Sequence, residues 1–487
     1  MGKSRLTISP DGFIMEVDTF FGTQMEETAV EEKKIAIFEK MPVWKAVTAL
    51  ALPAILSQLV TMIYNLADTF YIGQLGDPNM VAGVSLSFPA FMILTAFGNL
   101  FGIGGGSLIS RKLGEKRTED ARHVASFSLF GALLFTLVYT VFLGFFADPI
   151  LRFLGASDAT IGYGRDYLFW TAVVGGAPTI VAMLLGHLLR SEGFARQSSV
   201  GIAVGGILNI LLDPLFIFVF RMDVAGAAIA TAISNLASAL FYVIVILRLG
   251  KRSHVSLDPS KAFVSRDLVR QVFSVGLPAA AASLFANLAN SCLNIVLSWH
   301  GDLAVAVMGV VKRIDMIPLN VALGLSQGAL PLIAYNYAAK QYDRMEGLSR
   351  FARGAGAGFA ILCVVFFELF APDLVLFFIK DSATVELGAS FLRVACLGTI
   401  PMVMFFLLNT TFQAMGEGKQ SFFLVFCRQI LFNLPILFAF NFFFGTVGAV
   451  WTQPVADVLA VILATAFFTA TMRRLRREEA AAAAQAA

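Results

Sequence analysis

Long apolar segments recur along this entire chain and restrict what it can become. Each is long enough to cross the hydrocarbon core of a bilayer, which takes about 20 helical residues. The chain is 57% hydrophobic and only 14% charged, whereas soluble proteins are about 25% charged. Backbone groups in lipid must be paired internally, so the spans should be helices. We therefore predict an all-α integral membrane protein with twelve transmembrane helices, at about 45–72, 79–109, 121–147, 161–188, 197–220, 224–248, 267–299, 303–335, 351–371, 384–412, 420–444 and 447–472.

The second half of the chain repeats the first. Leu52-Pro53 matches Leu277-Pro278, and Asn65 matches Asn290, both at an offset of 225 residues. Gly98 and Gly102 meet Gly324 and Gly328 after a one-residue slip. Six helices per repeat give both halves the same orientation, so the repeat axis lies along the membrane normal, a common transporter design. We expect two pseudo-symmetric six-helix bundles around a central cavity.

The distribution of lysine and arginine predicts the orientation. Basic residues gather in alternate connections, for example after the second and eighth spans, and at the C-terminus. Because basic loops stay on the cytoplasmic side, we expect both termini in the cytoplasm and a multi-pass protein of the cell membrane. The expected parts are a cytoplasmic tail (1–40), an N-terminal lobe (41–250), a cytoplasmic linker (251–266), a C-terminal lobe (267–473) and a cytoplasmic tail (474–487).

Two acidic residues of the first half, Asp68 and Asp213, stand out within strongly apolar parts of their spans. Asp68 is the only acidic residue of the first span, and an ionisable group at membrane depth is by default a functional one. Asn209 and Asp213 are four residues apart and share a helix face. At about 1.5 Å per residue, Thr231 of the sixth span reaches a similar depth, so these four polar groups could meet. Their repeat counterparts are Leu293, about Ile430, about Leu434 and Gln453, so the acids are confined to one half.

Other intramembrane charges leave two interpretations open. Lys312, Arg313 and Asp315 lie about three turns into the eighth span, where they could line a cavity, or Lys312 could pair with Asp315. Asp457 of the twelfth span could pair with Arg428 of the eleventh or contact a substrate.

Several familiar chemistries have no counterpart in the sequence. The glycine-rich run at 98–107 follows no strand and lacks a Gly-Lys-Ser/Thr ending, so it favours helix packing over nucleotide binding. The four histidines fit no metalloprotease spacing, and no Gly-x-Ser-x-Gly occurs. The four cysteines lack metal-ligand spacing, and a net charge of +3 does not indicate nucleic acid. We therefore predict a protein that is not an enzyme and has no cofactor or resident metal.

A set of short motifs occurs along most of the chain. They are Leu52-Pro53, Asn65 to Gly73, Ser110-Arg111-Lys112-Leu113-Gly114, Asn209 to Pro214, Ser326-Gln327-Gly328 with Asn336-Tyr337, and Gln413-Ala414-Met415-Gly416. Through this set, residues 42–475 resemble the MATE (multidrug and toxic compound extrusion) transporters, most closely their DinF-type branch.

The resemblance implies roles for individual residues. In that family a cation site of the N-terminal lobe uses the positions that match Asp68, Asn209, Asp213 and Thr231, and the first helix is thought to bend at the position of Pro53. NorM-type members carry further acids in the seventh and tenth helices. Here the seventh span offers Asn287, Asn290 and Asn294, and the tenth has no acid beyond Glu386, at its start.

The combined interpretation is an ion-coupled antiporter that works by alternating access. We expect it to export organic, cationic and amphipathic compounds such as drugs against uptake of H⁺ or Na⁺, as a monomer in the lipid bilayer. An exporter or flippase of one lipid-linked or metabolic substrate is the alternative in the same superfamily. A receptor or scaffold that only binds is the alternative from another class, and the duplicated bundles and buried acids argue against it.

Overall fold

The computed structural model describes residues 36–378 and 381–486, and these residues are almost entirely helical. Glycine- and proline-containing turns separate long apolar helices, as expected for a chain that must pair its backbone within each segment. The elements are η1 Ala36–Lys40, α2 Val43–Gly73, α3 Pro78–Gly114, α4 Thr118–Phe153, α5 Ile161–Leu168, η2 Phe169–Val174, α6 Gly176–Ser191, α7 Ala195–Pro214, η3 Leu215–Val219, α8 Asp223–Leu249, η4 Gly250–Arg252, η5 Pro259–Ala262, α9 Arg266–Ser298, α10 Asp302–Ala338, α11 Tyr342–Leu376, α12 Ser382–Cys396, α13 Thr399–Met415, α14 Gly418–Phe426, η6 Cys427–Phe432 and α15 Asn433–Ala486.

These helices make twelve membrane crossings within the described residues. Ten are long and apolar enough to span a bilayer, and the pair formed by α5–η2 and α6, bent by 52°, makes an eleventh. The last of the ten, 418–485, holds two crossings because Gly445 interrupts the helix with φ 61° and ψ −140°. The chain reverses there, since the Asn433 side chain donates to Gln453 at 2.9 Å, whereas 20 residues of continuous helix would span about 30 Å. The predicted number of spans is confirmed.

Some helix limits differ from the prediction. α11 begins at Tyr342 rather than near 351, because its first turns are too polar to be recognised by hydropathy. The tenth span is divided into α12 and α13 at Leu397 and Gly398. The tail expected from 474 continues α15 as helix to Ala486. Of the N-terminal tail expected at 1–40, residues 1–35 lie outside the described residues, and 36–40 form the π-helical turn η1.

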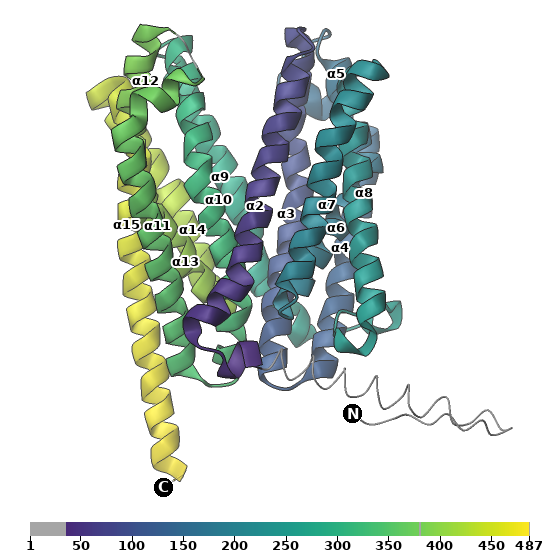
Figure 1. The fold of residues 1–487 in the computed structure, drawn as a ribbon, viewed down its shortest axis with the longest axis vertical. Coiled ribbons are helices and arrows are strands. Elements are labelled where there is room, and N and C mark those ends of the chain that lie inside the picture. Colours follow the sequence, from purple (N-terminus) through teal and green to yellow (C-terminus); the bar gives the residue numbers. More distant parts are fainter. Residues whose placement is uncertain (1–35, 379–380, 487) are drawn as a thin grey trace, which may run out of the picture.

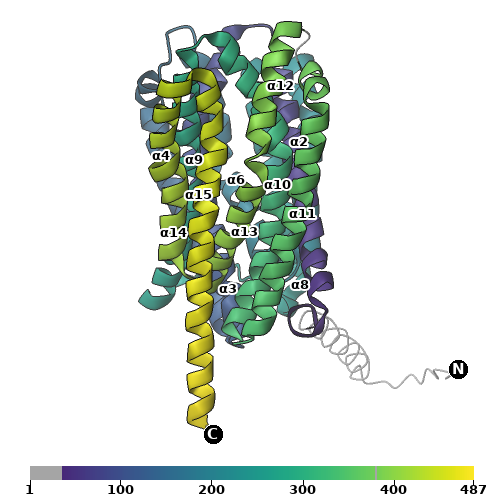
Figure 2. The ribbon, with the colours of Figure 1, turned by 90° about the vertical axis from the view of Figure 1, so that its left-hand side faces the viewer.

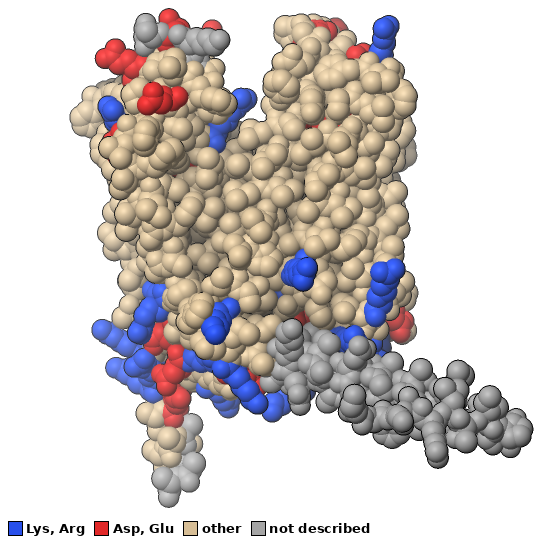
Figure 3. All heavy atoms as spheres, viewed as in Figure 1, with Lys and Arg blue, Asp and Glu red and all other residues tan. Residues whose placement is uncertain are grey.

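Two lobes, α2–α8 and α9–α15, lie side by side, and α2 runs along the boundary between them (Figure 1). A view turned by 90° shows the long helices running together along the vertical axis (Figure 2). In the space-filling view, a cleft between the lobes opens at one end, and most lysines and arginines lie at the opposite end (Figure 3). We call that opposite end the basic end. The predicted central cavity is thus a cleft open on one side.

The lobes are held together towards the basic end by close helix crossings. A Cβ atom on Gly276 of α9 would collide with the Leu100 carbonyl of α3, and one on Gly328 of α10 would collide with Ala51 of α2. Small residues allow such close backbone approach in membranes. Ser107 of α3 also donates to the Gln413 carbonyl of α13 at 2.6 Å.

The linker between the lobes is bound to the N-terminal lobe. Glu192, at the end of α6, accepts hydrogen bonds from the Ser253 hydroxyl at 2.8 Å and the His254 amide at 2.6 Å. Further along, Lys261 forms an ion pair with Glu119 of α4 at 3.2 Å. The linker is therefore an ordered strap over α4 and α6.

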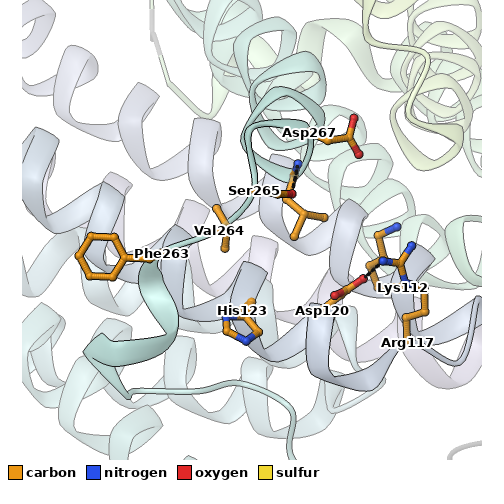
Figure 4. Close-up of a pocket in the computed structure, with 9 residues that line it drawn as sticks. Lys112, Arg117, Asp120, His123, Phe263, Val264, Ser265 and Asp267 are labelled. Carbon is orange, nitrogen blue, oxygen red and sulfur yellow. Dashed lines mark hydrogen bonds and ion pairs between the residues drawn. The ribbon is translucent and has the colours of Figure 1, made fainter.

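A hollow of about 370 Å³ lies where this strap meets α3, α4 and the start of α9 (Figure 4). Its basic side chains are already paired. Arg117 contacts Asp120 at 2.5 Å, and Lys112 contacts Glu115 at 2.8 Å. The hollow therefore offers little free positive charge.

Candidate functional site

Three of the four predicted site residues form one hydrogen-bonded cluster in the N-terminal lobe. Asn209 and Asp213 share a face of α7, and the Asn209 amide donates to Asp213 Oδ1 at 3.2 Å. The same amide nitrogen lies 3.3 Å from Thr231 Oγ1 of α8. Asp213 is fully buried and Asn209 is 3% exposed. The i, i+4 spacing and the depth argument thus correctly brought these residues together.

The local fold around Asp213 follows from Pro214. Proline has no N–H and cannot continue the α-helical hydrogen-bond ladder, and α7 ends at this residue and continues as the π-helical turn η3. Such π-turns are frequent at functional sites because they redirect side chains. The turn is fixed by packing, since Ile217 is buried against Ile72 and Ala227. Asp213 therefore sits at a rigid irregularity of the helix.

Asp68 approaches this cluster from α2. It is close enough to Asp213 for the two charges to interact, although Asp68 has no hydrogen bond to the cluster within the described residues. Tyr64, one turn earlier on α2, and Tyr167 of α5 also lie within electrostatic range of Asp68. Sequence reasoning missed both tyrosines. The i, i+4 spacing to Asp68 could have indicated Tyr64, whereas Tyr167 comes from another helix and carries no such signal.

The cluster contains buried oxygens that no group of the described protein satisfies. They are Asp68 Oδ1, Asn209 Oδ1 and Asp213 Oδ2. An unpartnered buried polar atom costs on the order of 1–3 kcal/mol, more if charged. Oxygen atoms of carboxylates and amides suit either a proton or a hard cation. The donor set therefore fits the expected H⁺ or Na⁺ chemistry.

The C-terminal lobe contains a different polar network. Arg428 of η6 contacts Asp457 of α15 at 2.5 Å, and the two side chains are only 6% and 1% exposed. Gln453 donates to both oxygens of Asp457, at 3.1 Å each, and Asn433 donates to Gln453 at 2.9 Å. Phe405 lies against the Arg428 guanidinium, with its ring centroid 5.1 Å away. The pairing of Arg428 with Asp457 thus matches one of the two interpretations left open by the sequence.

The remaining predicted cavity residues lie on α10. Lys312 and Asp315 are half-buried and Arg313 is exposed. Of the two interpretations left open by the sequence, the i, i+3 ion pair between Lys312 and Asp315 does not form within 4 Å among the described residues. Asp315 is instead 3.5 Å from Thr399 Oγ1 of α13. Residue spacing along α10 could not predict this contact, because Thr399 belongs to another helix.

Pro53 lies in the part of α2 that packs on the C-terminal lobe. Ala51 and Ile55, on either side of it, pack on Gly328 and Gly324 of α10. Towards the open end, Val60 and Tyr64 pack on Gly206 of α7. The Ser57 hydroxyl donates to the Pro53 carbonyl at 2.8 Å. One end of α2 is thus docked on the C-terminal lobe and the other on the N-terminal lobe.

Comparisons with known proteins agree with this architecture. The sequence model of the MatE family matches residues 53–215 and again 278–439. The Multidrug export protein MepA of Staphylococcus aureus (strain MRSA252) is 31% identical over 436 residues, which cover 89% of this chain and 95% of that protein.

Solved structures match nearly the whole chain. One is described as the outward-facing conformation of a multidrug resistance MATE family transporter of the MOP superfamily; it has a TM-score of 0.85 and 26% identity, and the match covers 91% of this chain and 98% of that one. A structure described as MATE in the bent conformation has a TM-score of 0.84 and 25% identity, over 92% and 99% of the two chains.

Two repeated six-helix lobes around a cleft, with buried acids at the wall of one lobe, define a membrane transport protein. The family matches and the extent of the MepA similarity make the assignment specific. The chain belongs to the MatE family. The two matched ranges start at Pro53 and Pro278, which are 278 − 53 = 225 residues apart, so the internal repeat found in the sequence is that of the family. The finer assignment to the DinF-type branch stays a prediction.

Proposed function

We propose that this protein is an antiporter, not an enzyme, that exports organic, cationic and amphipathic small molecules in exchange for H⁺ or Na⁺. The observation that carries the proposal is the set of unpartnered buried oxygens on Asp68, Asn209 and Asp213. A structural polar cluster would be expected to satisfy these groups internally. Three carboxylate and amide oxygens grouped in one cluster can together accept a proton or a hard cation, which supports binding of the exchanged ion here.

The coupling role is assigned to the two acids. Asp213 places a carboxyl group at a fixed π-turn, and Asp68 adds a second carboxyl group from α2. Uptake of a positive charge at this pair relieves their repulsion and changes the forces on α2, which also contacts the C-terminal lobe. We infer that ion uptake here drives the change between the two open states and disfavours retained substrate.

The proposed orientation places the basic end in the cytoplasm, with both termini. Lysines and arginines gather at this end (Figure 3), as the positive-inside rule requires of cytoplasmic loops. The cleft of this structure is then open to the outside. This state is supported by the similarity to the transporter structure described as outward-facing.

Multidrug transport is supported by the relatives. MepA is named as a multidrug export protein, and exposed apolar side chains of both lobes, including Phe88 and Met316, offer the soft surface that suits varied ligands. The alternative of one lipid-linked or metabolic substrate predicts instead that one compound is exported and that unrelated organic cations are not.

Transport by purified protein in proteoliposomes tests the proposal. Proton and sodium gradients are imposed in turn, with a fluorescent organic cation as the probe, and one of the two gradients should drive its export. Counterflow without any gradient should also occur, because an antiporter exchanges labelled for unlabelled substrate. Binding without counterflow and without gradient-driven flux would identify a receptor or scaffold and reject the proposal.

A further inference from the structure

A groove on the outer side of the C-terminal lobe is lined by arginines that the transport function does not use. It lies between α11 and α15, which both pack on α13, and it has a volume of about 400 Å³. Figure 3 shows basic side-chain atoms, with some acidic ones among them, around the ends of these two helices. The lining residues are Glu346, Arg350, Phe468, Met472, Arg473 and Arg476, with Thr469 at the rim.

The charges of this groove are not balanced. Glu346 accepts from Arg350 at 2.7 Å and from Arg476 at 2.6 Å. Arg473 of the groove and the adjacent Arg353 have no acidic partner within 4 Å among the described residues. The three lining arginines and the adjacent Arg353 exceed the one lining glutamate by 4 − 1 = 3 charges. Asp343 and Glu479 lie within electrostatic range of Arg476. The hollow of Figure 4, at the same end of the molecule, has its basic side chains paired instead.

Three of the four arginines, Arg350, Arg353 and Arg476, are also held in position. Glu346 is 17% exposed and fixes one guanidinium from each helix. Arg353 lies over the ring of Phe468, with 4.5 Å between its guanidinium carbon and the ring centroid, and donates to the Ser349 carbonyl at 3.3 Å. Preorganised guanidinium groups bind phosphate oxygens through two parallel hydrogen bonds.

The floor of the groove is apolar and continues towards the bilayer. Phe468 is 6% and Met472 is 7% exposed. Beyond the arginines, Ile361 of α11 and Ile462 of α15 are exposed by 50% and 61%. One turn after Arg350, a Cβ at Gly354 would have nothing within 4 Å, so open space continues along α11. An apolar track that starts at a cationic pocket has the shape of a lipid site.

The position of the groove along the two helices also agrees with a lipid ligand. Between Arg353 and Pro372, α11 contains one charged residue, Glu368, and between Val447 and Thr471, α15 contains one, Asp457. The arginines thus stand where both helices enter the hydrocarbon region. Basic pockets between transmembrane helices at this level bind anionic lipid head groups.

We propose that the groove between α11 and α15 binds an acidic glycerophospholipid, with its phosphate against Arg350 and Arg473 and an acyl chain along the exposed apolar faces of the two helices. Because α11 and α15 both pack on α13, a lipid bound between them would fasten these two helices to the core of the C-terminal lobe.

The test is thermal unfolding of the purified full-length protein in neutral detergent. Phosphatidylglycerol or phosphatidylcholine with identical acyl chains is titrated, and the unfolding midpoint is recorded. Wild type should be stabilised at lower concentrations of the anionic lipid. Arg350→Gln/Arg473→Gln should raise the required concentration on the order of tenfold. Inorganic phosphate and glycerol phosphate serve as soluble probes.

Arg248→Gln/Arg270→Gln is the matched control. It removes the same charge at the same end, from exposed arginines of α8 and α9, and should keep the wild-type response. Thr469→Trp keeps every charge and fills the groove, so it should also weaken the lipid effect, which keeps the test valid if the arginine variant does not fold. The proposal would be overturned if the control pair weakened the lipid effect as much as Arg350→Gln/Arg473→Gln, or if both lipids stabilised wild type equally. It would also be overturned if soluble phosphate gave the full stabilisation, or if Thr469→Trp responded to the lipid like wild type.

Discussion

In the N-terminal lobe, Asn209 donates to Asp213 and leaves Asp213 Oδ2 without a partner. In the C-terminal lobe, Arg428 and Gln453 saturate Asp457. Both clusters lie beside a π-helical turn, η3 in one lobe and η6 in the other. Two similar scaffolds thus leave an oxygen of one buried acid without a protein partner and give the other acid an internal counter-charge.

The two arrangements differ in what they contribute. A buried ion pair contributes little net stability, but removal of one partner leaves an uncompensated charge at a high cost. An acid without a partner is itself costly, and its removal relieves strain. The same Asp-to-Asn change should therefore affect transport in one lobe and stability in the other.

The largest expected effect is the loss of coupling in the N-terminal lobe. Asp213→Asn and Asp68→Asn should each abolish gradient-driven export in proteoliposomes, because each replaces a carboxylate by a neutral near-isostere. The unfolding midpoint should stay at or above that of wild type, since no ion pair is lost. An export rate equal to wild type in either variant would remove that acid from coupling.

The matching change in the C-terminal lobe should act on stability. Asp457→Asn leaves Arg428 buried without its counter-charge, with Lys312 also within electrostatic range, and should cost about 3–5 kcal/mol of unfolding free energy. The ion that drives residual export should not change. Arg428→Met/Asp457→Leu should recover most of the loss, because it removes both charges together; failure to recover would show that the pair does more than neutralise itself.

A smaller effect on stability is expected in the C-terminal lobe at the positions where the repeat has leucines in place of the acids. Leu293, the counterpart of Asp68, is 7% exposed and packs with Val296 and Leu297. Leu293→Ala should lower the unfolding free energy by about 2–3 kcal/mol, and Leu434→Ala by less, because Leu434 is only half-buried. Neither variant should change the ion requirement of export, and a changed requirement would contradict a site confined to one lobe.

Much of this comparison could be predicted from the sequence. The repeat, the twelve spans and the grouping of Asn209, Asp213 and Thr231 follow from apolar periodicity, an offset of 225 residues and helical rise. These are local or one-dimensional properties of the chain.

What could not be predicted depends on contacts between distant helices. Asp315 lies near Thr399 of α13, and Tyr167 of α5 lies near Asp68 of α2. Residue spacing along one helix predicts neither contact. The groove between α11 and α15 brings together side chains from positions more than 120 residues apart. From the sequence alone, these arginines could only be used to predict the orientation in the membrane.

The smallest expected effect concerns the helix that joins the two lobes. Pro53 lies where α2 is docked on α10, while the turns around Val60 and Tyr64 are docked on α7. If the lobes move relative to each other, α2 must bend between these two attachments, and proline makes this possible because it leaves the carbonyl one turn earlier without its usual donor.

Pro53→Ala would restore that hydrogen bond and stiffen the joint. We expect substrate affinity near that of wild type and intact ion dependence. Turnover should slow several-fold but by less than about tenfold, which corresponds to ~1.4 kcal/mol in the activation free energy. Ser57→Ala is the matched control, because it removes the hydroxyl that bonds to the Pro53 carbonyl without adding a donor at position 53, and it should leave turnover close to normal. If Pro53→Ala turned over as fast as wild type at matched reconstitution, α2 would move as a rigid body. The N-terminal site would then act on the other lobe through helix packing alone.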